Sequence, residues 1–182
     1  MHALLTIFFI PTYVTIYKVT NNLNIARLYA HSLLVFYPVK ELIDNKMYQF
    51  NNLIDYNYTS ELSGYIAVQY FIYDSFYIYQ QKPYLFHHLL CSFGIMYGIY
   101  YNIYHVLFLY LLLGEISTIF LDLCELNICK KINYLLFKIN FIVFRLMLLP
   151  VLTYKCYNNT LIFIMLSSDC FLHMYWIKKA IC

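Results

Sequence analysis

Charged side chains are scarce in this chain. They make up 12% of its 182 residues, whereas 63% of the residues are hydrophobic. That charged fraction is about half the value of an ordinary soluble domain. The net charge of +3 is small and dispersed along the sequence, which excludes a nucleic-acid-binding protein. Internal repeats and Gly/Ser-rich linkers are also lacking. The composition predicts a membrane protein without a separate soluble domain.

Metal-binding motifs are missing as well. The six cysteines form no CxxC pair and most lie in or beside apolar runs, so we expect neither a zinc site nor a disulfide framework. The six histidines form no HxxHH-like box, which argues against the di-iron chemistry of membrane desaturases and hydroxylases. We therefore predict no metal and no resident cofactor.

The chain instead contains apolar segments of about membrane-spanning length, separated by short polar breaks. They predict an all-α, multi-pass transmembrane helical bundle with six core helices. The first segment contains Pro11 and is short, so whether it forms a seventh span or a signal anchor is left open. The segments are residues 3–17, 26–43, 62–80, 85–101, 102–124, 132–154 and 160–177. The expected domains are residues 1–25 as N-terminal span and connecting loop, 26–178 as membrane domain and 179–182 as tail.

The distribution of lysine and arginine gives an orientation if all seven segments span. One side then carries seven of these residues and the other carries three, among them Lys46. The positive-inside rule makes the first side, with the C-terminus, cytosolic. Two N-x-[ST] triplets, at Asn57 and Asn158, fall on the opposite side, where glycosylation would take place.

Ionisable residues recur inside the apolar segments. Each costs on the order of 2.5–3.5 kcal/mol at the centre of a span, so these residues need partners or a wet cavity. From the helical rise, most of them lie roughly 3–14 Å from the cytosolic end of their spans, and Arg145 lies about 20 Å from it. We therefore predict a polar cavity that opens to the cytosol, with Arg145 reaching Asp169 or Glu115. The residues are His31, Asp74, His87, His88, Glu115, Arg145, Asp169 and His173.

Two interpretations of these residues are kept. Asp74, Glu115 and Arg145 could form an interhelical ion-pair lattice or take part in a functional site. For His87 and His88 we favour function, because adjacent rings point about 100° apart on a helix and packing would need only one. A histidine oriented by Asp74 or Glu115 can act as general base or acyl-accepting nucleophile. Such a site suits an acyl-CoA donor and a lipid amine.

Six stretches in the same order link the chain to a known family. They are "ARLYAHSLLVFY" with His31, "GYIAVQYFIYDSF" with Asp74, "FHHLLCSFG" with the histidine pair, "LLLGEISTIF" with Glu115 and Ser117, "FIVFRLMLLP" with Arg145 and Pro150, and "MYWIKK" with Trp176. Over about residues 26–178 the chain resembles the TLC-domain family, which includes the ceramide synthases and the translocon-associated TRAM proteins. It looks closest to the small TLC-domain-containing transmembrane proteins.

The resemblance implies a bundle of six core helices around a lipid-accessible cavity, usually in the endoplasmic reticulum. It implies a role in lipid homeostasis, with membrane lipids as partners. An alternative is a ceramide-synthase-like N-acyltransferase that joins acyl-CoA to a sphingoid base, with His87 and His88 in the active site. A third is a non-enzymatic lipid-cargo or trafficking factor. Tentative catalytic residues are His87, His88, Asp74 and Glu115, and expected cavity or ion-pair residues are His31, Arg145, Asp169, His173 and Ser117.

Overall fold

The computed structural model describes residues 2–44, 58–103 and 105–181, and in these ranges the regular elements are helices. The predicted all-α class is confirmed. The predictions for Lys46 and Asn57 lie outside the described residues. The elements are α1 (His2–Thr20), α2 (Leu23–Asp44), α3 (Tyr58–Ile78), α4 (Lys82–Tyr101), α5 (His105–Leu112), α6 (Glu115–Glu125), α7 (Lys130–Asn140), the π-helix η2 (Phe141–Leu148), α8 (Leu149–Lys155) and α9 (Thr160–Ile181).

The helices form a multi-pass transmembrane bundle. Among the described residues, three helical stretches are long and apolar enough to cross a membrane: Val106–Glu125, Lys130–Lys155 and Thr160–Lys178. The buried share is lowest in Lys130–Lys155, at 17%. Because its exposed residues are mostly apolar, such as Leu135 and Met147, this stretch suits contact with lipid chains.

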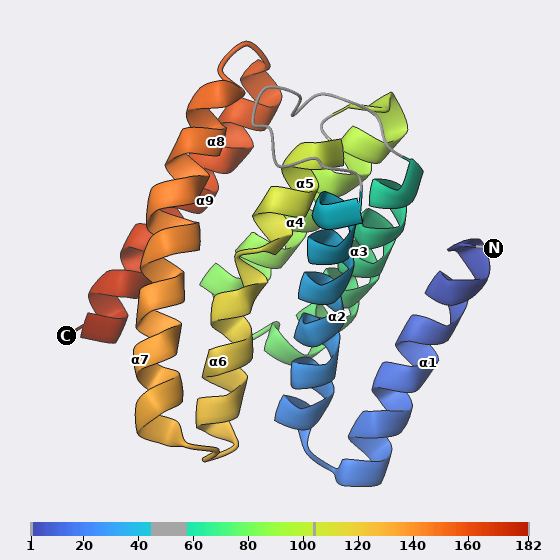
Figure 1. The fold of residues 1–182 in the computed structure, drawn as a ribbon, viewed down its shortest axis with the longest axis vertical. Helices are drawn as coiled ribbons and strands as arrows, with labels where there is room; N and C mark the ends of the chain where they lie inside the picture. Colours follow the sequence, from blue (N-terminus) through green and yellow to red (C-terminus); the bar gives the residue numbers. More distant parts are fainter. Residues whose placement is uncertain (1, 45–57, 104, 182) are drawn as a thin grey trace.

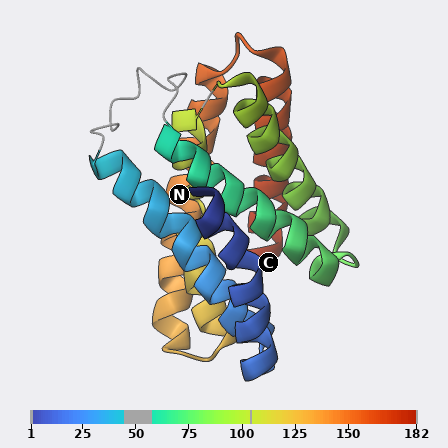
Figure 2. The same ribbon diagram turned by 90° about the vertical axis from the view of Figure 1, so that its right-hand side faces the viewer.

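Helix α2 packs on α1, α3, α5 and α6 (Figures 1 and 2). Its small residues Ala26 and Ala30 are fully buried, and small residues allow close helix approach in membranes. Helix α3 also packs on α4 and α5, whereas α9 closes the other side against α4, η2 and α8. Residues far apart in the sequence on α2, α3, α4, α6, η2 and α9 are thereby placed around one interior.

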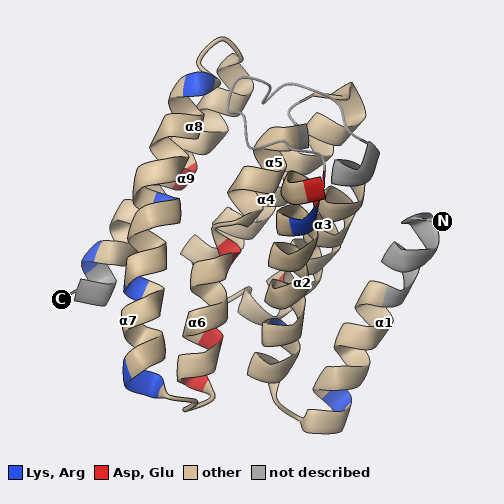
Figure 3. Cartoon of the chain, viewed as in Figure 1, with Lys and Arg blue, Asp and Glu red and all other residues tan. Residues whose placement is uncertain are grey.

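The connections alternate between the two ends of the bundle. The α1–α2 and α6–α7 connections lie at the lower end in Figure 1, and the α4–α5 and α8–α9 connections lie at the upper end. Figure 3 shows basic residues at the lower ends of α1 and α7. Asn158 is exposed in the α8–α9 turn, at the upper end.

Helix α4 ends in a turn before α5. Asn102 ends α4 in the left-handed region at φ 53°, a conformation that asparagine tolerates. The Ile103 amide donates to the Gly98 carbonyl at 2.9 Å. A Cβ at Gly98 would collide with the Phe108 ring and approach the Ile103 carbonyl, so this position needs glycine for close approach of α5.

Two predicted segments differ from simple helices. Residues 102–124 hold a break at Leu113 and Gly114, between α5 and α6. Residues 132–154 contain η2, a π-helical turn that carries Arg145. One hydrogen bond connects the helix break and the π-helix, since the Arg145 Nε donates to the Gly114 carbonyl at 3.2 Å. Breaks and π-turns free or rotate backbone groups in this way, often at functional sites.

Candidate functional site

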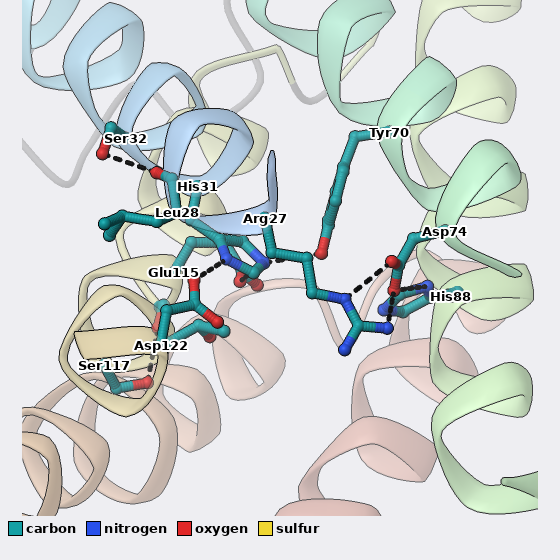
Figure 4. A network of polar contacts seen from close by, with 12 residues as sticks. Arg27, Leu28, His31, Ser32, Tyr70, Asp74, His88, Glu115, Ser117 and Asp122 are labelled. Atoms are coloured by element: carbon teal, nitrogen blue, oxygen red, sulfur yellow. Dashed lines mark hydrogen bonds and ion pairs between the residues drawn. The ribbon is translucent and has the colours of Figure 1, made fainter. Parts of the chain in front are cut away.

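Asp74 on α3 is approached by polar side chains from three neighbouring helices. Arg27 on α2 donates from Nε and Nη2 to its two carboxylate oxygens at 2.9 and 3.2 Å. His88 on α4 places Nδ1 at 3.8 Å from the other side (Figure 4). Tyr13 of α1 adds a hydroxyl at 3.5 Å. The bidentate guanidinium pair satisfies a carboxylate that is almost fully buried. The Nδ1 of His88 makes no hydrogen bond.

His31 on α2 has partners on both ring nitrogens. Its Nδ1 lies 2.6 Å from an Asp122 oxygen and its Nε2 lies 2.7 Å from the Tyr70 hydroxyl. Glu115 is 3.6 Å from Nε2. If Nδ1 donates to Asp122, Nε2 accepts from Tyr70, and no lone pair remains for chemistry. Figure 4 shows this ring between α3 and α6. His31 is therefore suited to joining helices.

Arg145 on η2 is the centre of the buried polar network. Its guanidinium donates to Ser117 at 3.1 Å, to Thr118 at 2.8 Å and to Glu115 at 3.2 Å. Its Nη1 lies 2.7 Å from the Nε2 of His173. The rigid fork of five N–H groups allows one side chain to serve all these acceptors. The sequence predicted that Arg145 reaches either Asp169 or Glu115, and in the structure it binds Glu115.

His87 on α4 is oriented by α9. Its Nδ1 lies 2.6 Å from an Asp169 oxygen, and its ring lies edge-on to Trp176 and His173, with centroids 5.3 and 5.5 Å away. Asp169 is also 3.7 Å from His173. The carboxylate bonded to His87 is thus Asp169, whereas Asp74 lies nearer His88. An imidazole whose Nδ1–H donates to a carboxylate presents the basic lone pair on Nε2.

Two chambers meet at His87. The polar chamber has a volume of about 400 Å³ and is lined by both histidines of the pair. The apolar chamber has a volume of about 80 Å³. It is lined mainly by apolar residues of α4, α5, α8 and α9, such as Leu107 and Leu166. Three side chains line both chambers: His87, Glu115 and Arg145. An amphipathic molecule could place its head in one chamber and its chain in the other.

One group of described residues could hold a metal ion. Ligand atoms of His87, Cys91 and Asp169 lie within 4.8 Å of one another. However, the 2.6 Å separation of His87 Nδ1 and Asp169 Oδ1 is shorter than the roughly 3.3 Å between nitrogen and oxygen ligands on tetrahedral zinc. A direct hydrogen bond explains that contact better.

The structure brings together all nine residues proposed from the sequence. His87, Glu115 and Arg145 line both chambers; His31, Asp74, His88 and Ser117 line the polar chamber, and Asp169 and His173 line the apolar one. The catalytic roles of His87, His88, Asp74 and Glu115 stay predictions.

Four further contributors were not selected as site residues from the sequence. They are Arg27, Tyr70, Cys91 and Asp122. Arg27, Tyr70 and Cys91 each stand four residues from a proposed residue, so one-turn spacing on a helix was the available signal. Asp122 stands seven residues after Glu115, on the same face.

Comparison with known protein families identifies the chain. The family model described as TLC domain matches residues 25–182. Since the match covers most of the sequence, the chain belongs to the TLC-domain family, and the resemblance predicted from the motifs is confirmed. No curated protein and no solved structure matches the chain.

Proposed function

We propose that this TLC-domain protein controls membrane lipid composition by binding a lipid or acyl chain across its two chambers. The observation that carries the proposal is the shared wall of His87, Glu115 and Arg145 between a polar and an apolar chamber. Lipids have a polar head and apolar chains, so their two ends need these two environments. Lipid interaction is general to the family.

The charge of the polar chamber favours an amine at the lipid head. Its lining includes four carboxylates, from Asp74, Glu115, Asp122 and Glu125, against three Arg or Lys side chains, together with three histidines. With the histidines neutral, an added cation would therefore be stabilised. A lipid amine such as a sphingoid base fits this balance.

A more specific candidate is N-acylation of such an amine by acyl-CoA. The Asp169–His87 hydrogen bond at 2.6 Å favours it, because it fixes the imidazole with Nε2 available as base or acyl acceptor. In this reaction the amine nitrogen forms a bond to the acyl carbonyl carbon while the bond from that carbon to the CoA sulfur breaks. His87 would take the amine proton, and His88 lines the chamber where the amine would bind.

The proposed setting is the endoplasmic reticulum, with the polar chamber and the C-terminus on the cytosolic side. The family resemblance supports the organelle. The excess of Lys and Arg on one side of the predicted spans supports the orientation. Acyl-CoA would then reach the polar chamber from the cytosol as a co-substrate.

Labelled lipid synthesis tests the proposal. Wild type and the His87→Ala/His88→Ala double variant are expressed in cells that lack ceramide synthases, and labelled acyl-CoA is followed into ceramide and phospholipids. We expect wild type to change the labelled lipids and the double variant to lose the change. A Ser168→Ala variant is the control, since this exposed hydroxyl on α9 bonds only its own helix at Ile164.

The outcomes separate the two levels of the proposal. If wild type changes phospholipids but forms no N-acylated product, the acyltransferase candidate is excluded and lipid control stands. If the double variant folds, reaches its membrane and matches wild type for every lipid, the histidine pair is structural and the proposed site is wrong.

A further inference from the structure

Cys91 stands at the junction of the candidate base and the apolar chamber. It follows His87 by one helical turn on α4, and its Sγ lies 3.7 Å from Nδ1 and 3.8 Å from Nε2 of that ring. It also lines the apolar chamber. None of the other described cysteines lines the polar or the apolar chamber.

The bonding of His87 decides which nitrogen can act on this thiol. Nδ1 is held by Asp169 at 2.6 Å, so Nε2 keeps the free lone pair. The Cys91 sulfur lies nearly equidistant from the two nitrogens and would turn toward Nε2 to give up its proton. A nucleophile within reach of a base that a third group orients is the general arrangement for covalent catalysis, and such contacts are often longer in ligand-free proteins. Asp169, His87 and Cys91 occupy these three positions on α9 and α4.

We propose that Cys91 is a nucleophile that accepts a fatty acyl group from an acyl thioester and holds it in the apolar chamber. The proposal rests on the acyl-CoA part of the proposed function and adds a covalent intermediate on sulfur. The thiol is placed where a chain bonded to it would extend along Ile95, Leu107 and Leu111, which line the same chamber.

The step balances as a thioester exchange. His87 Nε2 takes the proton of Cys91, and the thiolate sulfur attacks the carbonyl carbon of the acyl-CoA. A bond forms between Cys91 Sγ and that carbon, the bond between the carbon and the CoA sulfur breaks, and the CoA thiolate leaves with the proton from His87. No oxidant or reductant is needed. A lipid amine in the polar chamber can then attack the new thioester: a bond forms between the amine nitrogen and the acyl carbon, the bond from that carbon to Cys91 Sγ breaks, and the amine proton passes to the released Cys91 thiolate.

The polar chamber supports transfer from this position. His88 directly follows His87 on α4 and lines that chamber. Its Nδ1 is buried without a hydrogen bond. An amine entering from the polar side would therefore lie beside His88, one residue from the base that serves the thiol. In this thioester route His87 serves the thiol and His88 the amine, whereas in direct transfer from acyl-CoA His87 would take the amine proton.

Direct mapping of the acyl adduct tests the proposal. The purified full chain in phosphatidylcholine vesicles is mixed with alkyne-labelled palmitoyl-CoA, and the labelled peptide is identified by mass spectrometry. We expect a label on Cys91 that neutral hydroxylamine removes, as for a thioester. Cys91→Ala should lose it, and His87→Gln should slow its formation at least 100-fold, the lower range for loss of a general base.

Cys170→Ser provides the matched control. Cys170 is partly buried on α9 and contacts the Thr153 hydroxyl at 3.6 Å, and it lines neither chamber. Its replacement should leave labelling unchanged, which separates directed acylation from nonspecific reaction of thiols. Because the adduct is mapped on wild type, the result does not depend on how well the Cys91 variants fold.

Other results would overturn the proposal. They are a wild type that carries no label on Cys91, a label on His87 instead, or a Cys91→Ala variant that N-acylates an amine at the wild-type rate. The last two leave the proposed function standing. A thiol that reacts with maleimide only after a chelator removes zinc would assign the cluster to a metal. An adduct on Cys91 without N-acylated lipid would support the thiol and exclude the acyltransferase candidate.

Discussion

Replacing Arg145 by methionine removes the centre of the buried network while keeping a long, flexible side chain. The guanidinium donates to Gly114, Ser117, Thr118 and Glu115. Glu115 would be left as a buried carboxylate without its arginine partner. Breaking a buried ion pair on one side costs about 3–5 kcal/mol. For a chain of this length that loss lowers the unfolding midpoint by roughly 6–20 °C.

Thermal unfolding of the purified protein in one detergent measures this change. Arg145→Lys should recover only part of the loss, because one ammonium cannot serve so many acceptors. The double variant Arg145→Met/Glu115→Gln should be more stable than Arg145→Met, since the unpaired charge is gone. Lys138→Met is the control, as Lys138 lies over the exposed Tyr134 ring at 4.6 Å and contributes about 0.5–1 kcal/mol. An Arg145→Met protein as stable as the control would refute the network as a source of stability.

Three further predictions follow from individual contacts. Gly98→Ala should destabilise the fold by about 1–3 kcal/mol through overpacking on Phe108, and Gly64→Ala should cost less because only the flexible Ile95 and Ile99 side chains face it; equal unfolding midpoints would contradict this. Tyr70→Phe should cost roughly 1–3 kcal/mol by leaving His31 Nε2 without its hydroxyl, against a smaller loss for Tyr77→Phe on the same helix, and denaturant titration compares the two. An impermeant maleimide should label the exposed Cys129 from the cytosol and a cysteine at Asn158 only from the lumen, in a Cys182→Ser background; the reverse pattern would overturn the proposed orientation.

Apolar runs predicted most helices well. The expected segment 26–43 is α2, Leu23–Asp44, and the expected segment 160–177 is α9, Thr160–Ile181. A long apolar run has few alternatives in a bilayer, because backbone groups need internal hydrogen bonds. The break at Gly114 and the π-turn at Arg145 were not predicted. Nothing in an apolar run distinguishes a glycine that interrupts a helix from one that packs inside it, and the π-turn depends on the partners of Arg145.

Partner choice within the site was the harder part. Depth along each span predicted that the ionisable residues share a layer, and several of them do contact one another. Depth does not fix how far each helix is rotated about its axis, which is set by packing between helices. For this reason the sequence predicted Asp74 or Glu115 as the carboxylate that orients the histidine. In the structure Asp169 binds His87 at 2.6 Å. Arg27 was also not selected from the sequence as a site residue, although its guanidinium binds Asp74.

Crosslinking with a photoreactive acyl chain locates the lipid directly. Full-length protein in vesicles is irradiated with a fatty acyl-CoA that carries a diazirine near its methyl end, and the crosslinked peptides are identified. If the apolar chamber binds the chain, crosslinks fall on α5 and α9 near Leu107 and Leu166, and Leu166→Trp reduces them by filling the chamber. Crosslinks confined to outward-facing residues such as Phe76 and Phe93, exposed by 72% and 57%, and unchanged by Leu166→Trp, would contradict a lipid site between the helices.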